Sequence, residues 1–181
     1  ALSIANVMAT PTYYWLNAVA GRDIPEALNR EWGLGEPAPA DPTWRSLSPA
    51  YNVDRIRTPF MMQLPEQEYR PNVELLARLQ RAGVPAELWA FADEAHIKWQ
   101  PRHRLAANQR NLDWFRFWLG HEADRDPAKV EQYRRWCAWP TAPARACGHM
   151  PAPQLLDQAS ASISGKSQNR RSSAGSTGSE R

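Results

Sequence analysis

The chain has 181 residues, 43% of them hydrophobic, with nine tryptophans, which is enough apolar mass for one globular domain and excludes a chain that is disordered throughout. The formal net charge is +3, and residues 151–181 carry two of these charges because four basic residues there oppose two acidic ones. That distribution argues against a nucleic-acid partner, which needs a broad basic surface. A membrane partner is not expected either, since no apolar run approaches the ~18 residues of a spanning helix.

The first half of the chain predicts helices followed by a strand–helix–strand unit. Residues 1–9 are typical of a short buried segment, and residues 10–32 are helical in parts. The apolar run 59–64 is short and limited by prolines, which favours a buried strand. A helix follows, in which we expect Pro71 to occupy the first turn and Gly83 to end the element. The next strand is predicted at residues 86–91.

The second strand leads into a polar loop, residues 92–100, that contains His96. A helix is predicted over 103–119, with an apolar stripe and two tryptophans beside it that we expect to pack in the core, namely Leu105, Leu112, Phe115, Leu119, Trp114 and Trp118. Residues 127–136 are compatible with one more helix. Strand, helix, strand and helix with short connections indicate parallel pairing with right-handed crossovers, so the predicted fold class is α/β.

The end of the chain changes character after Trp139. Residues 160–181 consist mostly of Ser, Gly, Ala and Arg, with almost nothing to bury, so we expect a domain over 1–139 and a largely disordered tail over 140–181. The run Gly165-Lys166-Ser167 imitates the end of a phosphate-binding loop, but no strand precedes it and Ser160 stands where that motif requires glycine. We therefore treat this match as chance.

Cys137 and Cys147 have no companions at the spacing of a zinc site, and one pair is too little to indicate a disulfide-built secreted fold. A zinc site from His96 and His103 is also disfavoured, because a spacing of seven residues interrupted by Pro101 does not place both imidazoles on one helical face. We expect no bound metal.

Charged side chains follow both predicted strands. Glu66 and Glu68 come after the first strand, and Asp93, Glu94 and His96 come after the second. The carboxyl ends of parallel strands meet at one edge of a sheet, where α/β proteins place their reactive groups. An acid and a histidine are what a hydroxyl nucleophile needs, because the imidazole takes its proton while the carboxylate fixes the tautomer and stabilises the imidazolium.

The nucleophile itself is missing from this pattern. In α/β-hydrolases the chain order is nucleophile, acid, histidine, and the order Glu68 then His96 agrees with it. The sequence contains no G-x-S-x-G motif, and Ser3, Ser46 and Ser48 lack the flanking glycines of a nucleophile elbow. We therefore expect the chain to begin after the nucleophile and to be inactive alone.

Several runs resemble the C-terminal stretch of the prolyl oligopeptidase family of α/β-hydrolases. They are Ser48-Pro49, IRTPFM at 56–61, LLARLQRAG at 75–83, VPAEL at 84–88, and Phe91 together with Glu94-Ala95-His96. The stretch ADEAHIKWQPRHRLAANQRNLDWFRFWLG, residues 92–120, is similar to the lasso-peptide isopeptidase branch of that family. The resemblance implies that the chain is the C-terminal part of an α/β-hydrolase parallel sheet with flanking helices.

The resemblance also implies site residues. Most of the family has a glycine and then an aspartate after the first of these strands, whereas this chain reads QLPEQEY at 63–69. In the isopeptidase branch a glutamate serves as the acid, and Glu68 best matches its position, with Glu66 as the fallback. Asp93 and Glu94 remain competitors from the residues alone. His96 is the implied catalytic histidine.

The function implied by this resemblance is hydrolysis of a peptide or isopeptide bond through an acyl-enzyme, with no cofactor. The implied partner is a peptide substrate, and a lasso peptide is favoured. Two alternatives stay open: an inactive fragment or interaction module whose helix at 103–119 packs against a partner, and an esterase that uses the same residues. The sequence does not determine the oligomeric state or the compartment. A cytoplasmic location is favoured.

Overall fold

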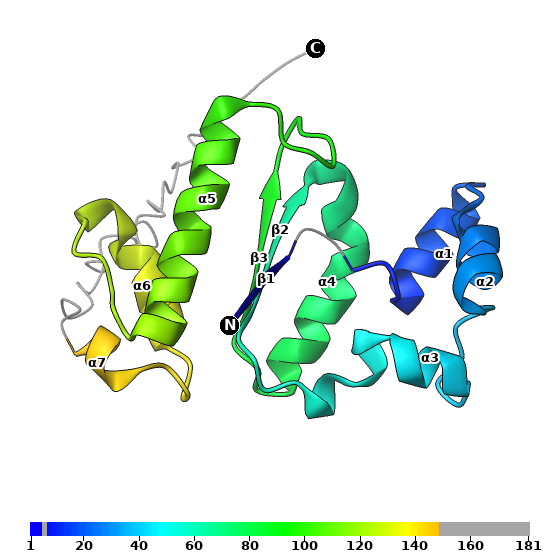
Figure 1. The fold of residues 1–181 in the computed structure, drawn as a ribbon, viewed down its shortest axis with the longest axis horizontal. Helices are drawn as coiled ribbons and strands as arrows, with labels where there is room; N and C mark the ends of the chain where they lie inside the picture. The colour runs from blue at the N-terminus through cyan, green and yellow to red at the C-terminus, as the bar shows by residue number, and fades with distance from the viewer. Residues whose placement is uncertain (5–6, 149–181) are drawn as a thin grey trace, which may run out of the picture. The chain divides into compact units, whose positions relative to one another are not determined.

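The computed structural model describes residues 1–4 and 7–148 (Figure 1). The expected disordered tail thus lies outside the described residues from position 149 onward. Residues 140–148 are packed structure and include the short helix α7 (Ala144–Cys147), in which Ala146 is buried. The division of the chain after Trp139 stays a prediction. Within the described residues, no helix is long and apolar enough to cross a membrane.

The centre of the fold is a parallel sheet of three strands in the order β1-β2-β3 (Figure 1). Its strands are β1 (Leu2–Ile4), β2 (Phe60–Pro65) and β3 (Ala86–Phe91). Both neighbouring pairs are parallel, and in the register of β2 and β3 the last residues, Pro65 and Phe91, stand opposite each other. The predicted α/β class is therefore confirmed, and both strands expected from the sequence are present.

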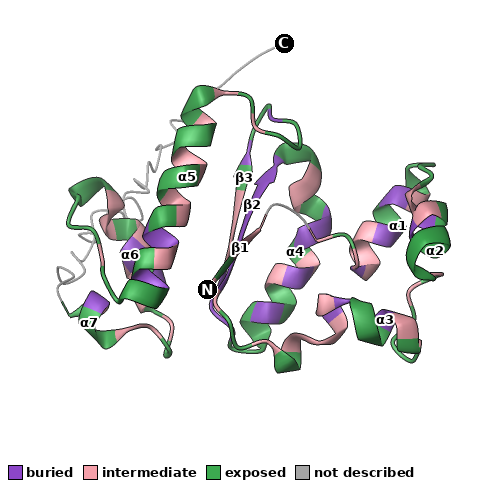
Figure 2. Ribbon diagram, in the orientation of Figure 1, coloured by how far each residue is buried: buried purple, intermediate pink, exposed green. Residues whose placement is uncertain are grey.

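Strand β2 is buried along its whole length because helices cover both faces of the sheet (Figure 2). Side chains alternate between the faces of a strand. Phe60, Met62 and Leu64 accordingly pack with Leu75 and Leu79 of helix α4 on one face. On the other face Met61 joins an aromatic cluster from the helices after β3, made of Trp114, Phe117, Trp118, Tyr133 and Trp136.

Helix α4 (Glu66–Arg81) begins earlier than the sequence suggests. We expected Pro71 in the first turn, but the helix starts directly after Pro65 and Pro71 lies inside it. Pro71 is the sixth residue of the helix and lies beyond the first turn, so the helix lacks the hydrogen bond that an N–H at this position would donate to the carbonyl of Gln67. The early start places Glu66 and Glu68 in the first helical turn, where the helix dipole stabilises negative charge.

Helix α5 (Pro101–Phe115) continues into a π-helical turn, η3 (Arg116–Gly120). The predicted burial of Trp114 and Trp118 is confirmed, and Phe117 is buried with them. The predicted stripe is wrong for Leu105, Leu112 and Leu119, which are exposed. Two apolar stripes run side by side on this helix, and the larger aromatic side chains occupy the face toward the sheet because burying them removes more apolar area from water.

The chain closes with the 3₁₀ turn η4 (Pro127–Lys129) and helix α6 (Val130–Cys137), whose Tyr133 and Trp136 complete the aromatic cluster. A disulfide joins Cys137 to Cys147 and so links α6 to α7. Their pairing does not follow from the sequence pattern, because it depends on how the two helices pack.

Between β1 and β2 the chain forms α1 (Pro11–Val19), α2 (Ile24–Trp32) and α3 (Pro42–Leu47), followed by the 3₁₀ turns η1 (Pro49–Tyr51) and η2 (Val53–Arg55). The three helices share a small core of Tyr14, Leu28, Leu34 and Trp44.

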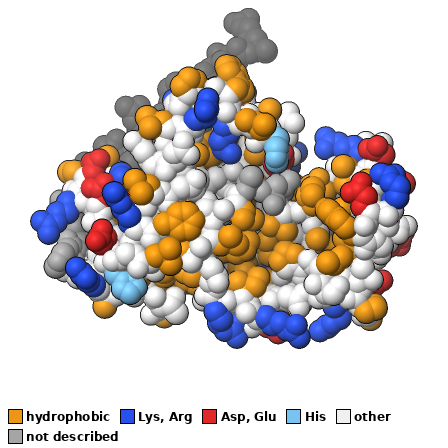
Figure 3. All heavy atoms as spheres, in the orientation of Figure 1, with side chains coloured by type: hydrophobic (Ala, Val, Ile, Leu, Met, Phe, Trp, Pro, Cys, Tyr) orange, Lys and Arg blue, Asp and Glu red, His pale blue; other side chains and the backbone are white. Residues whose placement is uncertain are grey.

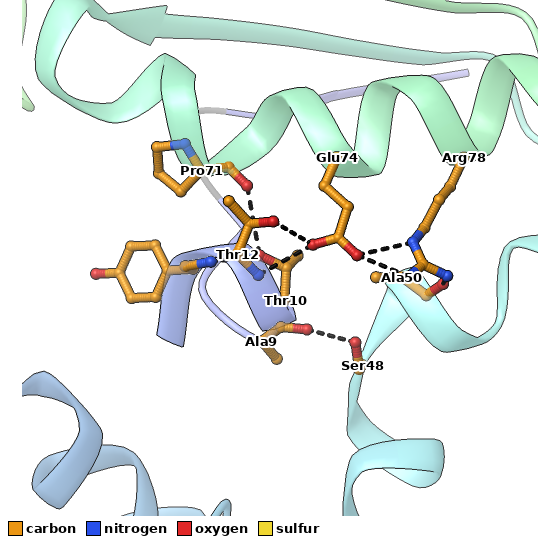
Figure 4. A network of polar contacts seen from close by, with 9 residues as sticks. Ala9, Thr10, Thr12, Ser48, Ala50, Pro71, Glu74 and Arg78 are labelled. Atoms are coloured by element: carbon orange, nitrogen blue, oxygen red, sulfur yellow. Dashed lines mark hydrogen bonds and ion pairs between the residues drawn. The ribbon is translucent and has the colours of Figure 1, made fainter. Parts of the chain in front are cut away.

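A polar network attaches α1 to α4 (Figure 4). Glu74 of α4 accepts hydrogen bonds from the backbone N–H and the hydroxyl of Thr12, at 3.0 and 2.5 Å, and pairs with Arg78. Apolar side chains stay exposed on α1, namely Trp15, Leu16 and Val19. On the side of the molecule drawn in Figure 3, hydrophobic side chains gather across the middle, in the region of α1 and α4.

Candidate active site

The candidate site lies where β2 and β3 end side by side. Strand β2 leads directly into the first turn of α4, and β3 leads into the loop of residues 92–100, which we call the His96 loop (Figure 1). Because Pro65 and Phe91 are paired in the sheet register, the acids that follow β2 and the residues that follow β3 emerge next to each other. The predicted juxtaposition of these two segments is therefore present.

The structure brings Glu68 and His96 into contact. Glu68 Oε1 lies 2.8 Å from His96 Nδ1. The histidine side chain is 65% exposed and the glutamate side chain 19% exposed, so the carboxylate approaches the ring from the protein side while the rest of the ring faces outward. The second carboxylate oxygen, Glu68 Oε2, is buried and has no hydrogen-bond partner within the described residues.

Tyr13 of α1 lies within the electrostatic reach of Glu68. Burial raises the pKa of the Tyr13 hydroxyl, and the negative charge of Glu68 raises it further, while Arg22 acts in the opposite direction. Helix α1 therefore forms part of the surroundings of the acid.

The fallback acid, Glu66, has a different partner. Its Oε2 accepts a hydrogen bond of 3.3 Å from the backbone N–H of Asp93. Asp93 has a φ of 52°, a left-handed conformation that non-glycine residues rarely adopt. Glu66 thus contacts the strained residue at the beginning of the His96 loop and not the imidazole.

Glu94 is a buried acid in the same loop. Its carboxylate accepts backbone hydrogen bonds from Trp99 at 2.8 Å and from Gln100 at 3.2 Å, and Oε1 lies 2.7 Å from His103 Nδ1 on α5. Burial raises the pKa of Glu94, but the hydrogen bonds from Trp99, His103 and Gln100 outweigh it, and the pKa lies below its usual value. Sequence reasoning treated Glu94 as a rival for the acid role and missed its partner, His103.

Lys98 brings a positive charge within the electrostatic reach of both Glu68 and Glu94. Its ammonium donates a 2.9 Å hydrogen bond to the carbonyl of Gln63 and lies over the ring of Phe91. Burial lowers the pKa of Lys98, against the opposing effect of the negative charges of Glu68 and Glu94. On the outer side of the loop, Ile97 and Trp99 expose apolar side chains next to His96.

The serines of the described chain are engaged elsewhere. Ser3 donates to Asn111, Ser46 to the carbonyl of Thr43 and Ser48 to the carbonyl of Ala9. No serine of residues 1–4 and 7–148 is hydrogen-bonded to a histidine. Over the same residues, no group of three or more His, Cys, Asp and Glu side chains is arranged to hold a metal ion.

Comparison with known proteins places the chain in a family. A sequence model described as the prolyl oligopeptidase family matches residues 5–122. The chain belongs to this family. Membership confirms the resemblance drawn from the sequence and relates the chain to serine peptidases.

One curated relative is the lasso peptide isopeptidase AtxE2 of Asticcacaulis excentricus, 40% identical over 112 residues, which are 62% of this chain and 16% of the relative. Two solved structures of the AtxE2 isopeptidase, the apo form and a serine-to-alanine variant with Astexin3-dC4 bound, match with a TM-score of 0.66 and 34% identity. They cover 76% of this chain, which spans 21% of theirs.

Proposed function

We propose that His96 and Glu68 are the histidine and the acid of a serine-type catalytic triad in an enzyme that hydrolyses peptide or isopeptide bonds. The observation that carries this proposal is the 2.8 Å contact between Glu68 Oε1 and His96 Nδ1 at the ends of two neighbouring parallel strands. Membership of the prolyl oligopeptidase family and the relation to a lasso peptide isopeptidase support it.

The geometry suits a general base. With its proton on Nδ1, His96 donates to Glu68, and Nε2 is left with the lone pair that accepts the proton of a serine hydroxyl. The carboxylate holds this tautomer and stabilises the imidazolium that forms, and the imidazolium then gives the proton to the leaving amine. The exposed ring leaves Nε2 reachable for a nucleophile.

The nucleophilic serine comes from outside this chain in our proposal, because the sequence contains no G-x-S-x-G motif. We expect the 181-residue chain alone to remain unlabelled by a fluorophosphonate probe, which reacts with activated serines. Robust labelling would contradict this part of the proposal and would indicate a nucleophile within the chain.

We propose a lasso peptide as the substrate, on the strength of the AtxE2 isopeptidase relatives and the solved variant with Astexin3-dC4 bound. The ring amide of such a peptide joins a backbone amine to an acidic side chain. The exposed apolar side chains of Ile97 and Trp99 beside His96 offer contact surface for a peptide.

The test uses the full-length gene product and follows opening of the ring amide by mass spectrometry, as the gain of one water. Glu68→Gln keeps the shape of the side chain but removes its charge, and we expect kcat to fall by roughly 10²-fold or more. Glu66→Gln is the matched comparison two residues away and should cost much less, since Glu66 accepts its hydrogen bond from the backbone of Asp93 and not from the imidazole.

An equal loss in both variants would refute the choice of Glu68 as the acid. A p-nitrophenyl ester serves as the substrate control. Cleavage of the ester without cleavage of the lasso peptide would favour the esterase alternative.

A further inference from the structure

The His96 loop is closed at its base by one carboxylate. Glu94 stands on the first limb of the loop, and its fully buried side chain accepts hydrogen bonds from the backbone of Trp99 and Gln100 on the returning limb. The side chain of Gln100 adds a 3.1 Å hydrogen bond to the carbonyl of Asp93. These contacts join the two ends of the segment that carries His96.

The same carboxylate fixes the loop to the next helix. Glu94 Oε1 lies 2.7 Å from His103 Nδ1, and the ring of His103 packs on Phe91 at the end of β3, with 5.3 Å between ring centroids. The strand end, the loop base and α5 therefore meet at Glu94. At the tip of the loop Ile97 is 80% exposed and His96 touches Glu68, while Lys98 donates a 2.9 Å hydrogen bond to the carbonyl of Gln63.

From this arrangement we infer that Glu94, with His103 as its partner, is the positioning residue that fixes where His96 stands relative to Glu68. The catalytic meaning of this inference rests on the proposed function. The structural part of the inference, that the buried Glu94–His103 pair holds the exposed Glu68–His96 pair in place, does not depend on the proposed function.

The position requires a carboxylate and not merely a polar side chain. The two oxygens of Glu94 accept from three donors, the N–H groups of Trp99 and Gln100 and the ring of His103. Glutamine offers one oxygen and one NH₂ group at the same place. In Glu94→Gln at least one donor at the loop base would therefore face another donor and lose its hydrogen bond, although the volume of the side chain is unchanged.

The experiment uses NMR on the full 181-residue chain and needs no activity. The first measurement is hydrogen exchange of the backbone amides of Trp99 and Gln100. The second is the nuclear Overhauser contact between the His96 ring and the Glu68 side chain. In Glu94→Gln we expect exchange at one or both amides to accelerate by about 10-fold or more, the effect of losing a hydrogen bond to a charged group, and the His96–Glu68 contact to disappear.

Glu87→Gln is the matched control. Glu87 is also a largely buried carboxylate with two donors, Arg135 and the indole of Trp136, but it lies on β3 outside the loop. This control should leave the His96–Glu68 contact in place. A purely stabilising role of Glu94 would instead accelerate exchange across the whole sheet and leave the contact intact, and that result would overturn the inference.

If Glu94→Gln does not fold, His103→Phe decides the question with the same measurements. Phenylalanine keeps the ring packed on Phe91 but cannot donate to Glu94. Retention of wild-type exchange at Trp99 and Gln100 together with the His96–Glu68 contact would overturn the inference. The proposed function fails separately, through full activity of Glu68→Gln, because neither NMR measurement depends on turnover.

Discussion

Two glutamate–histidine pairs lie side by side in this structure, and nearly the same contact joins each of them. Glu68 Oε1 is 2.8 Å from His96 Nδ1, and Glu94 Oε1 is 2.7 Å from His103 Nδ1. Their surroundings differ. His96 is 65% exposed and Glu68 has no second donor within the described residues, whereas His103 is 18% exposed and Glu94 is fully buried and accepts two backbone hydrogen bonds as well.

The difference teaches that a carboxylate–imidazole contact does not by itself define a catalytic pair. A histidine that is to exchange protons needs one ring nitrogen open to a reactant, which the exposed pair provides and the buried pair does not. A carboxylate that also binds backbone N–H groups is committed to holding a chain segment. We therefore assign chemistry to the exposed pair and support to the buried one.

The largest expected effect separates the two histidines. In the full-length gene product, His96→Ala removes the proposed general base, and kcat should fall by about 10²- to 10⁴-fold with little change in thermal unfolding, since the side chain is exposed. His103→Ala should reduce kcat less and lower the unfolding temperature more, because it removes a packed ring and a donor to Glu94. Steady-state kinetics and thermal melts measure both. A larger loss of kcat in His103→Ala than in His96→Ala would contradict the assignment of chemistry to the exposed pair.

A second effect is the dependence of stability on pH. The pKa of Glu94 in the folded chain lies below its usual value of 4.5, so the folded state binds this proton less readily than the unfolded state. The stabilisation by Glu94 is then fully present above pH 4.5 and is lost as the pH falls through the lower, folded pKa. The free energy of unfolding, measured with urea, should be higher for the wild type than for Glu94→Gln at pH 7, and this difference should become smaller at pH 3. A difference that does not depend on pH would contradict the hydrogen-bonded, ionised state of Glu94.

The smallest effect concerns the energy of the exposed pair. A double-mutant cycle on Glu68→Gln and His96→Ala, read by urea unfolding, should give a coupling of no more than ~1 kcal/mol, because the His96 side chain is 65% exposed and water competes for the contact. The corresponding cycle on Glu94 and His103 should give a larger coupling. Equal values would show that burial does not distinguish the pairs.

The sequence predicted the sheet well because β2 and β3 are short apolar runs limited by prolines and glycine, and the α/β class follows from their alternation with helices. On α5 and η3 the burial of Trp114 and Trp118 agrees with the prediction, but the stripe of Leu105, Leu112 and Leu119 faces solvent and not the core. Periodicity showed two adjacent apolar stripes, and only packing against α6 and the sheet selects the tryptophan face over Leu105, Leu112 and Leu119.

The site was predictable in part. The spacing of strand ends brought the acids and His96 together, but the choice between Glu66 and Glu68 depends on where α4 begins. Two residues on a helix differ by about 200° in direction. Because the helix starts at Glu66, the two glutamates point to different parts of the His96 loop. The partnership of Glu94 with His103 was missed, because it depends on how the loop folds back onto α5.

The left-handed backbone of Asp93 has a consequence for how this region can evolve. One residue before Glu94, the chain turns with a φ of 52°, and this turn precedes both Glu94 and His96. Glycine and asparagine accept such a conformation readily, whereas a β-branched residue does so at a cost of order 1–3 kcal/mol. Sequence drift at position 93 should therefore be confined to a few small or Asx-type residues, although its side chain takes part in neither pair.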